Sequence, residues 1–201
     1  MKKKYIISII IAILIIGLGI GIYLCLKDDD TKTNSDAIKF ASEYTTVTKD
    51  NVFVYRNAKE IINILEHGTG VVYLGFPECP WCQTYVKYLN EVAINIGVEK
   101  IYYFNILEDR TNNTEDYKKI VSLLENQLQY DEEGNERIFV PHVTIVREGK
   151  LVGYDFETSK DTLGFTLPND YWNEEKVTDL KEKLHSYMLE VIKDDCLSCD
   201  V

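Results

Sequence analysis

Gly75-Phe76-Pro77-Glu78-Cys79-Pro80-Trp81-Cys82 joins an apolar run, residues 71–74, to a stretch with helical periodicity, residues 83–96. Two thiols therefore stand where a strand turns into a helix. The first turn of a helix leaves backbone N–H groups unpaired and carries roughly half a positive charge, so it stabilises a thiolate, the form that attacks disulfides. Pro80 suits the first helical position because it has no N–H. The sequence predicts that Cys79 and Cys82 form a redox-active pair; the alternatives are a structural disulfide or half of a zinc site.

The composition indicates one globular domain with an attachment. The chain has 201 residues, of which 45% are hydrophobic and 27% are charged, and its formal net charge is −11. This balance is globular rather than disordered. A strongly acidic surface repels phosphates, which argues against nucleic acid as a partner and against a protein that lies flat on anionic lipid.

The attachment is an uncharged segment near the N-terminus. Residues 5–26 carry no charge, follow three lysines and precede Asp28-Asp29-Asp30. As a helix they would reach roughly 33 Å, enough to cross a hydrocarbon core. A cleaved signal has a shorter apolar region followed by a small-residue cleavage site, which is missing here, and Cys25 is expected to be an apolar thiol within the span rather than a lipidated residue. Lysine and arginine residues that flank a membrane span lie preferentially on its cytoplasmic side. The sequence therefore predicts a single-pass cell-membrane anchor with a cytoplasmic N-terminus and an extracytoplasmic body.

Five segments follow from this pattern. They are a basic tail (1–4), the transmembrane anchor (5–26), a tether with a short helix (27–50), the main domain (51–193) and a C-terminal tail (194–201). In the tether, Asp36 is expected to cap a short helix that carries Ile38, Ala41 and Tyr44 on one face.

Strands and helices alternate along the main domain. Strands are expected at 52–55, 71–76, 101–106, 142–147 and 151–155, helices at 58–66, 83–96 and 114–128 and from 173 onward, and irregular segments at 109–113, 130–137 and 158–172. The assignments rest on apolar periodicity and on turn residues between the runs. The order βαβαβαββα, whose last two strands form a hairpin, predicts an α/β fold.

This order, with C-x-x-C after the second strand and Val140-Pro141 before the hairpin, resembles the thioredoxin superfamily over roughly residues 52–193. The resemblance implies a central mixed sheet flanked by helices. It further implies that Cys79 is the attacking thiolate and that Cys82 resolves the mixed disulfide. By the same resemblance Pro141 is a cis proline that faces the pair, and the backbone of Val140 lies beside the sulfurs, where it pairs with an extended substrate.

The chain departs from the family at two buried positions. Tyr73 stands where the family has a buried acid, and Tyr103 stands, within a residue or so, at the place of its partner lysine. Glu78 adjoins Cys79, but a negative charge raises a thiol pKa. The helix terminus is therefore expected to provide most of the activation, or water to carry the proton of Cys82.

Trp81 and the C-terminal cysteines have several interpretations. Pro80-Trp81 is similar to the dipeptides of glutaredoxins and periplasmic oxidants, and Trp81 is expected to contact substrate. Cys196 and Cys199 form either a local disulfide, a second redox pair that exchanges with the first, or part of a metal site, for which no histidine lies near in sequence. His142, which follows Pro141, is expected to be a surface or hydrogen-bonded residue rather than a functional one.

The sequence predicts an extracytoplasmic thiol–disulfide oxidoreductase, bacterial in type, that needs no cofactor and no metal. Its partners would be proteins or peptides with a disulfide or dithiol, and a membrane electron carrier that recycles the pair; the direction of exchange is open. One alternative is an accessory protein for one exported disulfide peptide, because small anchored proteins similar to this one accompany bacteriocin export. The other is a non-catalytic binding module that uses the groove beside Val140-Pro141.

Overall fold

The computed structural model describes residues 32–156 and 164–192. The chain divides into two compact units, Met1–Asp36 and Ala37–Val201, and the second holds nearly all of the described residues. The expected anchor (5–26), its thiol Cys25, and Cys196 and Cys199 of the tail lie outside them. Within the described ranges no helix has the length and apolar character that a membrane span requires.

A mixed sheet of five strands forms the centre of the second unit. Its strands are β1 (Phe53–Tyr55), β2 (Gly70–Gly75), β3 (Ile101–Asn105), β6 (His142–Arg147) and β7 (Lys150–Asp155). They lie in the order β1-β3-β2-β6-β7. β3 pairs parallel with β1 and β2, whereas β6 runs antiparallel to β2 and β7. Parallel neighbours need helical crossovers and antiparallel ones need only a turn, so the predicted α/β class and the mixed sheet are confirmed.

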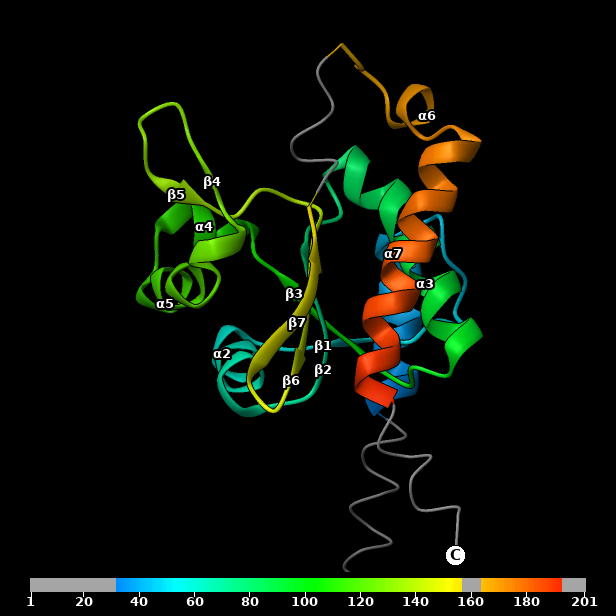
Figure 1. Ribbon diagram of the computed structural model, residues 1–201, viewed down its shortest axis with the longest axis horizontal. Helices are drawn as coiled ribbons and strands as arrows, with labels where there is room; N and C mark the ends of the chain where they lie inside the picture. The colour runs from blue at the N-terminus through cyan, green and yellow to red at the C-terminus, as the bar shows by residue number, and fades with distance from the viewer. Residues whose placement is uncertain (1–31, 157–163, 193–201) are drawn as a thin grey trace, which may run out of the picture. The chain divides into compact units, whose positions relative to one another are not determined.

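Helices cover both faces of the sheet. They are α2 (Ala58–His67), α3 (Pro80–Ile96), α4 (Leu107–Asn112), α5 (Glu115–Leu123), α6 (Pro168–Tyr171) and α7 (Glu174–Ile192). Figure 1 shows α3 and α7 on one side of the sheet and α2, α4 and α5 on the other. The expected flanking helices are therefore present.

The central strand β2 is buried on both faces. Val71 and Tyr73 belong to the core cluster that contains α3 and α7, whereas Val72 and Leu74 belong to the cluster that contains α2 and α5. Successive side chains of a strand point to opposite faces. A strand covered on both faces is apolar throughout, which explains why this run has no alternation in the sequence.

The expected loop at 109–113 is wrong, because α4 spans Leu107–Asn112. None of its residues is buried, so it has no apolar face that periodicity could reveal. The chain then turns at Asn113, which has a positive φ of 48°, and Thr114 caps α5 through its hydroxyl, which accepts the Tyr117 N–H at 3.1 Å. The expected helix to 128 ends at Leu123 and continues as a short 3₁₀ turn, Glu125–Gln127.

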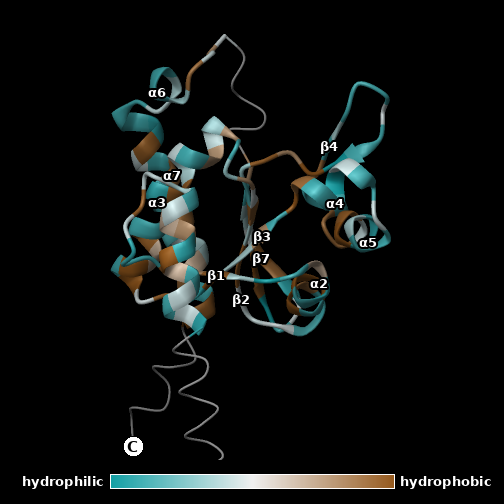
Figure 2. Ribbon diagram, turned by 180° about the vertical axis from the view of Figure 1, so that it is seen from behind, coloured by the Kyte–Doolittle hydropathy of each residue, from teal (hydrophilic) through white to brown (hydrophobic). Residues whose placement is uncertain are grey.

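The charged segment 130–137 forms a small hairpin rather than an irregular turn. Its strands are β4 (Gln129–Tyr130) and β5 (Glu136–Arg137), and the Asp131 carboxylate accepts the backbone N–H groups of Glu133 and Asn135. Figure 2 shows this hairpin as largely hydrophilic and the following residues, which lead to β6, as hydrophobic. In the expected loop 158–172, residues 168–171 form α6. Both elements are too short to give a periodic signal.

Residues 37–44 pack into the core. The expected face carried Ile38, Ala41 and Tyr44, but Ile38 is 53% exposed, whereas Ala37, Phe40 and Tyr44 are buried. The Phe40 ring stacks on Phe53 of β1 with 3.9 Å between centroids. Tyr44 is therefore buried as expected, whereas Ile38 is not, because contacts with β1 and β3, distant in sequence, decide which side of the helix turns inward. The expected cap at Asp36 is wrong, since the helix already includes residues 32–36.

We predict that Phe40→Ala lowers the free energy of unfolding by about 3–5 kcal/mol, since it removes a buried ring and leaves a cavity. Ile38→Ala, on the exposed side of the same helix, is the matched control and should change it by less than about 0.5 kcal/mol. Denaturant unfolding of the full chain measures both. Equal losses in the two variants would contradict the packing described here.

Candidate active site

The two thiols lie at the first turn of α3. Cys79 is the N-cap residue, with extended backbone angles, and its Sγ accepts the backbone N–H of Cys82 at 3.2 Å. Pro80 occupies the first turn, as predicted. An N-cap side chain accepts from the second or third helical residue, so the C-x-x-C spacing is the spacing that lets the first cysteine cap the helix.

The two sulfurs differ in their access to solvent. Both cysteines are free thiols; Cys79 is 8% exposed, and Cys82 is completely buried. Only Cys79 can therefore meet an incoming disulfide at the surface, whereas Cys82 reacts with a partner that is already bound to Cys79. This division agrees with the predicted roles of attacking and resolving thiol.

The electrostatic surroundings of the two thiols also differ. The pKa of Cys79 is lowered to about 7, first by a hydrogen bond from the Cys82 thiol and then, against the effect of burial, by the backbone N–H groups of Cys82 and Trp81. The pKa of Cys82 is raised well above its usual value, mainly by burial and by Cys79. The helix terminus was expected to provide most of the activation; the neighbouring thiol is the largest single cause, and the two N–H groups of the helix terminus follow it.

The expected cis proline adjoins the thiol turn. The Val140–Pro141 peptide bond is cis, as predicted. Leu74 of β2 pairs with His142 of β6, so the antiparallel register carries Pro141 to the place beside Gly75, where β2 leaves the sheet toward the thiols. Pro141 is buried and Val140 is half-buried. The described fold thus brings the two sequence-distant motifs to one edge of the sheet.

Arg110 is a residue of the site that the sequence did not reveal. It lies on α4, directly after β3, and the carboxyl ends of parallel strands meet at one edge of a sheet. The centre of its guanidinium lies 5.0 Å from the Phe76 ring, and its Nη1 donates to the Ile138 carbonyl at 3.3 Å. Its charge contributes to the lowered pKa of Cys79. The only sequence signal was an arginine shortly after an expected strand, and this signal could be interpreted only once the order of the strands was known.

Trp81 is part of an aromatic group at the rim. It is half-exposed, and its ring meets Tyr171 of α6 edge-on at 5.6 Å. Phe165 packs edge-on against the same tyrosine at 5.5 Å. Phe165 and Leu167 are 39% and 59% exposed. An apolar surface therefore adjoins the first turn of α3, and substrate contact by Trp81 stays a prediction.

Tyr73 and Tyr103 are neighbours in the core. Tyr73 of β2 pairs with Tyr103 of β3 in the sheet register, both are fully buried, and their rings stack with 5.8 Å between centroids. The Tyr44 hydroxyl donates to the Tyr103 hydroxyl at 3.2 Å. Burial raises the pKa of all three phenols, so they are neutral, and they belong to the same core cluster as Cys82.

His142 is a buried hydrogen-bonded residue, as expected. Its Nε2 lies 3.0 Å from the Thr144 hydroxyl, which donates to Gln127 at 2.9 Å. Burial lowers its pKa to about 4, so the ring is neutral at pH 7 and supports the start of β6.

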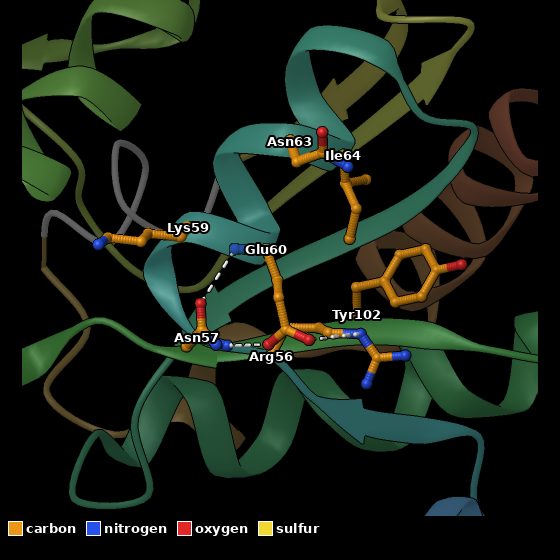
Figure 3. A pocket seen from close by; sticks show the side chains of 7 residues that line it. All are labelled: Arg56, Asn57, Lys59, Glu60, Asn63, Ile64 and Tyr102. Carbon is orange, nitrogen blue, oxygen red and sulfur yellow. Dashed lines mark hydrogen bonds and ion pairs between the residues drawn. The ribbon is translucent and has the colours of Figure 1, made fainter. Parts of the chain in front are cut away.

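A hollow beside α2 contains none of the thiol-site residues. It measures about 520 Å³ and is lined by Arg56, Asn57, Lys59, Glu60, Asn63, Ile64 and Tyr102 (Figure 3). Arg56 pairs with Glu60 at 4.0 Å and lies over the Tyr102 ring at 5.2 Å, while Asn57 and Glu60 cap α2 reciprocally. Three of its polar side chains are thus bonded to one another or to the backbone of α2, and no predicted site residue lines it. In residues 32–156 and 164–192, no three His, Cys, Asp or Glu side chains gather to hold a metal ion.

Comparison with known proteins gave no match to a family model, to a curated protein or to a solved structure.

We predict that alkylation of Cys79 in the full chain rises with pH and reaches half of its plateau at about pH 7, because the thiolate fraction grows through the lowered pKa. Cys82→Ala removes the thiol donor and should move this midpoint upward, toward about 8.5. Cys82→Ser keeps a hydroxyl donor and is the matched control, with a midpoint below that of the alanine variant. Mass mapping of the labelled peptide gives the rates, and an unmoved midpoint in Cys82→Ala would contradict this assignment.

A second prediction concerns Arg110. Arg110→Met removes the positive charge that favours the thiolate, so the midpoint of Cys79 alkylation should rise by less than in Cys82→Ala, because this charge is the smaller contribution. Arg56→Met removes the same charge from the hollow of Figure 3 and serves as the control. Equal midpoints in both arginine variants would exclude a local effect of Arg110.

Proposed function

We propose that this protein is an extracytoplasmic thiol–disulfide oxidoreductase that uses the Cys79–Cys82 pair. The observation that carries the proposal is the capping of α3 by the Cys79 sulfur, with the Cys82 N–H at 3.2 Å. This arrangement gives one activated thiol with a small exposed surface and one protonated thiol that is completely buried. A structural disulfide needs no such difference between its two cysteines.

The chemistry needs two electrons and no bound cofactor. The Cys79 thiolate attacks a substrate disulfide, so a Cys79–substrate bond forms and the substrate bond breaks, releasing one substrate thiolate. The Cys82 thiolate then attacks Cys79, forms the Cys79–Cys82 disulfide and releases the second substrate thiolate. The enzyme pair is oxidised and the substrate is reduced; the reverse sequence transfers two electrons the other way.

The proposal includes a thioredoxin-like fold. In support of it, the sheet is mixed, its last two strands form a hairpin, the thiols follow β2, and the cis Val140–Pro141 bond precedes β6. These features agree with the resemblance seen in the sequence. The backbone of Val140 would then pair with an extended substrate segment beside Cys79.

The proposed location is the outer side of a cell membrane, with residues 5–26 as the anchor. Its basis is the uncharged segment between lysines and aspartates. A thiol pair there requires a membrane electron carrier to reset it. The apolar rim of Trp81, Phe165 and Leu167 favours a polypeptide substrate over a small thiol. An accessory protein for one exported peptide would use the same pair on a single client.

We expect Cys79→Ser to reduce disulfide exchange to the uncatalysed rate, because it removes the attacking sulfur. Cys82→Ser should instead accumulate a mixed disulfide between Cys79 and the client, since the resolving thiol is missing. Gel analysis without reductant, using a disulfide-bonded client polypeptide, shows both outcomes.

The matched control is the double variant Cys196→Ser/Cys199→Ser, which keeps the first pair and should retain exchange. Titration of the Cys79–Cys82 couple against glutathione gives an independent answer. Undiminished exchange in Cys79→Ser, or a midpoint below about −300 mV, typical of structural disulfides, would refute the proposed function and favour the binding module.

A further inference from the structure

The Tyr73 hydroxyl is a buried polar group whose polar neighbours are the Cys82 thiol and the Tyr44 hydroxyl. Tyr73 is fully buried, and within the described part of the chain its hydroxyl has no hydrogen bond of ordinary geometry. The neighbouring phenols have partners, since Tyr44 donates to Tyr103 and Tyr85 donates to Asp155 at 2.8 Å. A buried hydroxyl without a well-formed hydrogen bond destabilises the fold, so this one calls for an explanation.

Gly75 provides the space that the hydroxyl occupies. Tyr73 and Gly75 lie on the same face of β2, two residues apart, and a Cβ added to Gly75 would lie 2.6 Å from the Tyr73 hydroxyl oxygen. Any larger residue would therefore displace the hydroxyl. The space lies where β2 leads into the thiol turn.

Cys82 is the reacting group beside this hydroxyl. Both residues belong to one core cluster, Cys82 is completely buried, and an interaction with Tyr73 is among those that lower the pKa of its thiol. The pKa of Tyr73 itself is raised well above its usual value, chiefly by burial. The phenol therefore keeps its proton, so it can donate a hydrogen bond to sulfur but cannot remove a proton from it.

We propose that the Tyr73 hydroxyl donates a hydrogen bond to the Cys82 thiolate as that thiolate forms, and so accelerates resolution of the mixed disulfide. This role rests on the exchange chemistry proposed above. As Cys82 attacks Cys79, its proton leaves to water or to the departing substrate sulfur, the Cys79–Cys82 bond forms, and the Cys79–substrate bond breaks. In the reverse direction Cys82 is the leaving thiolate and receives the same hydrogen bond.

In this role Tyr73 is a hydrogen-bond donor to Cys82 and not an acceptor of its proton. A buried carboxylate would accept the proton of the second thiol, whereas a neutral phenol stabilises the negative charge that remains on sulfur. Hydrogen bonds to charged groups are about twice as strong as those between neutral groups. The bond is therefore weak in the resting dithiol and strong when the thiolate forms, which is what acceleration of the step requires.

The test is single-turnover oxidation of the full chain by one equivalent of dithiobis-nitrobenzoate, in a background with Cys25, Cys196 and Cys199 replaced by serine. Attack by Cys79 releases one coloured thiolate, and attack by Cys82 on the mixed disulfide releases the second. Tyr73→Phe keeps the ring and its stacking but lacks the hydroxyl. We expect it to leave the first phase unchanged and to slow the second at least about tenfold, which corresponds to about 1.4 kcal/mol.

Tyr103→Phe is the matched control, because it removes a phenol hydroxyl from the same cluster. It breaks the bond with Tyr44, so it should lower stability while its second phase stays within about twofold of the parent. Tyr73→Phe should show the opposite pattern, with stability unchanged or higher. Gly75→Ala, which displaces the hydroxyl, should slow the second phase as well.

The outcomes separate this inference from the proposed function. A normal first phase with an unchanged second phase in Tyr73→Phe overturns the role of Tyr73 and leaves the exchange chemistry intact. Absence of the first phase in the parent, or its persistence in Cys79→Ser, refutes the proposed function itself. Equal slowing by Tyr73→Phe and Tyr103→Phe would assign the effect to general loosening of the core and also overturns the inference.

Discussion

The hydrogen bond from the Cys82 backbone to the Cys79 sulfur is the contact on which the site depends. It occupies one of the N–H groups that every helix leaves unpaired at its start, so the helix is capped by a sulfur in place of the usual oxygen. The same bond holds the two cysteines close together, with Cys79 slightly exposed and Cys82 completely buried. The difference in their pKa values, lowered for Cys79 and raised for Cys82, follows from this placement.

The directions of the strands place the other parts of the site beside the first turn of α3. β2 and β3 are parallel and end at the same edge, so the thiol turn after β2 meets Arg110 after β3. β6 is antiparallel to β2 and begins there, so Pro141 arrives from the opposite direction. Three segments that are far apart in sequence therefore converge on Cys79 because of strand direction alone.

The layer under the thiols is aromatic rather than charged. Tyr73 and Tyr103 stack across neighbouring strands, and Phe40 and Tyr44 cover them from the segment before β1. A buried charge costs several kcal/mol unless it is paired, and this layer avoids that cost by using neutral phenols. A thiolate on Cys82 would be stabilised by dipoles, such as the Tyr73 hydroxyl and the Phe76 backbone, and by the charge of Arg110, rather than by a charged group within this layer.

Features that are set by a few neighbouring residues were predictable from the sequence. The apolar runs of β2, β3 and β6, the start of α3 at Pro80 and the α/β class followed from periodicity and capping, and the resemblance supplied the cis bond at Pro141. Tertiary structure decided the rest: the inward face of residues 37–44, the place of Arg110, the contact between Tyr73 and Tyr103, and the short elements α4, β4 and β5. The two groups differ in the range of the interactions that decide them. Capping and periodicity act within one turn or strand, whereas burial and strand register depend on surfaces that only the folded chain brings together.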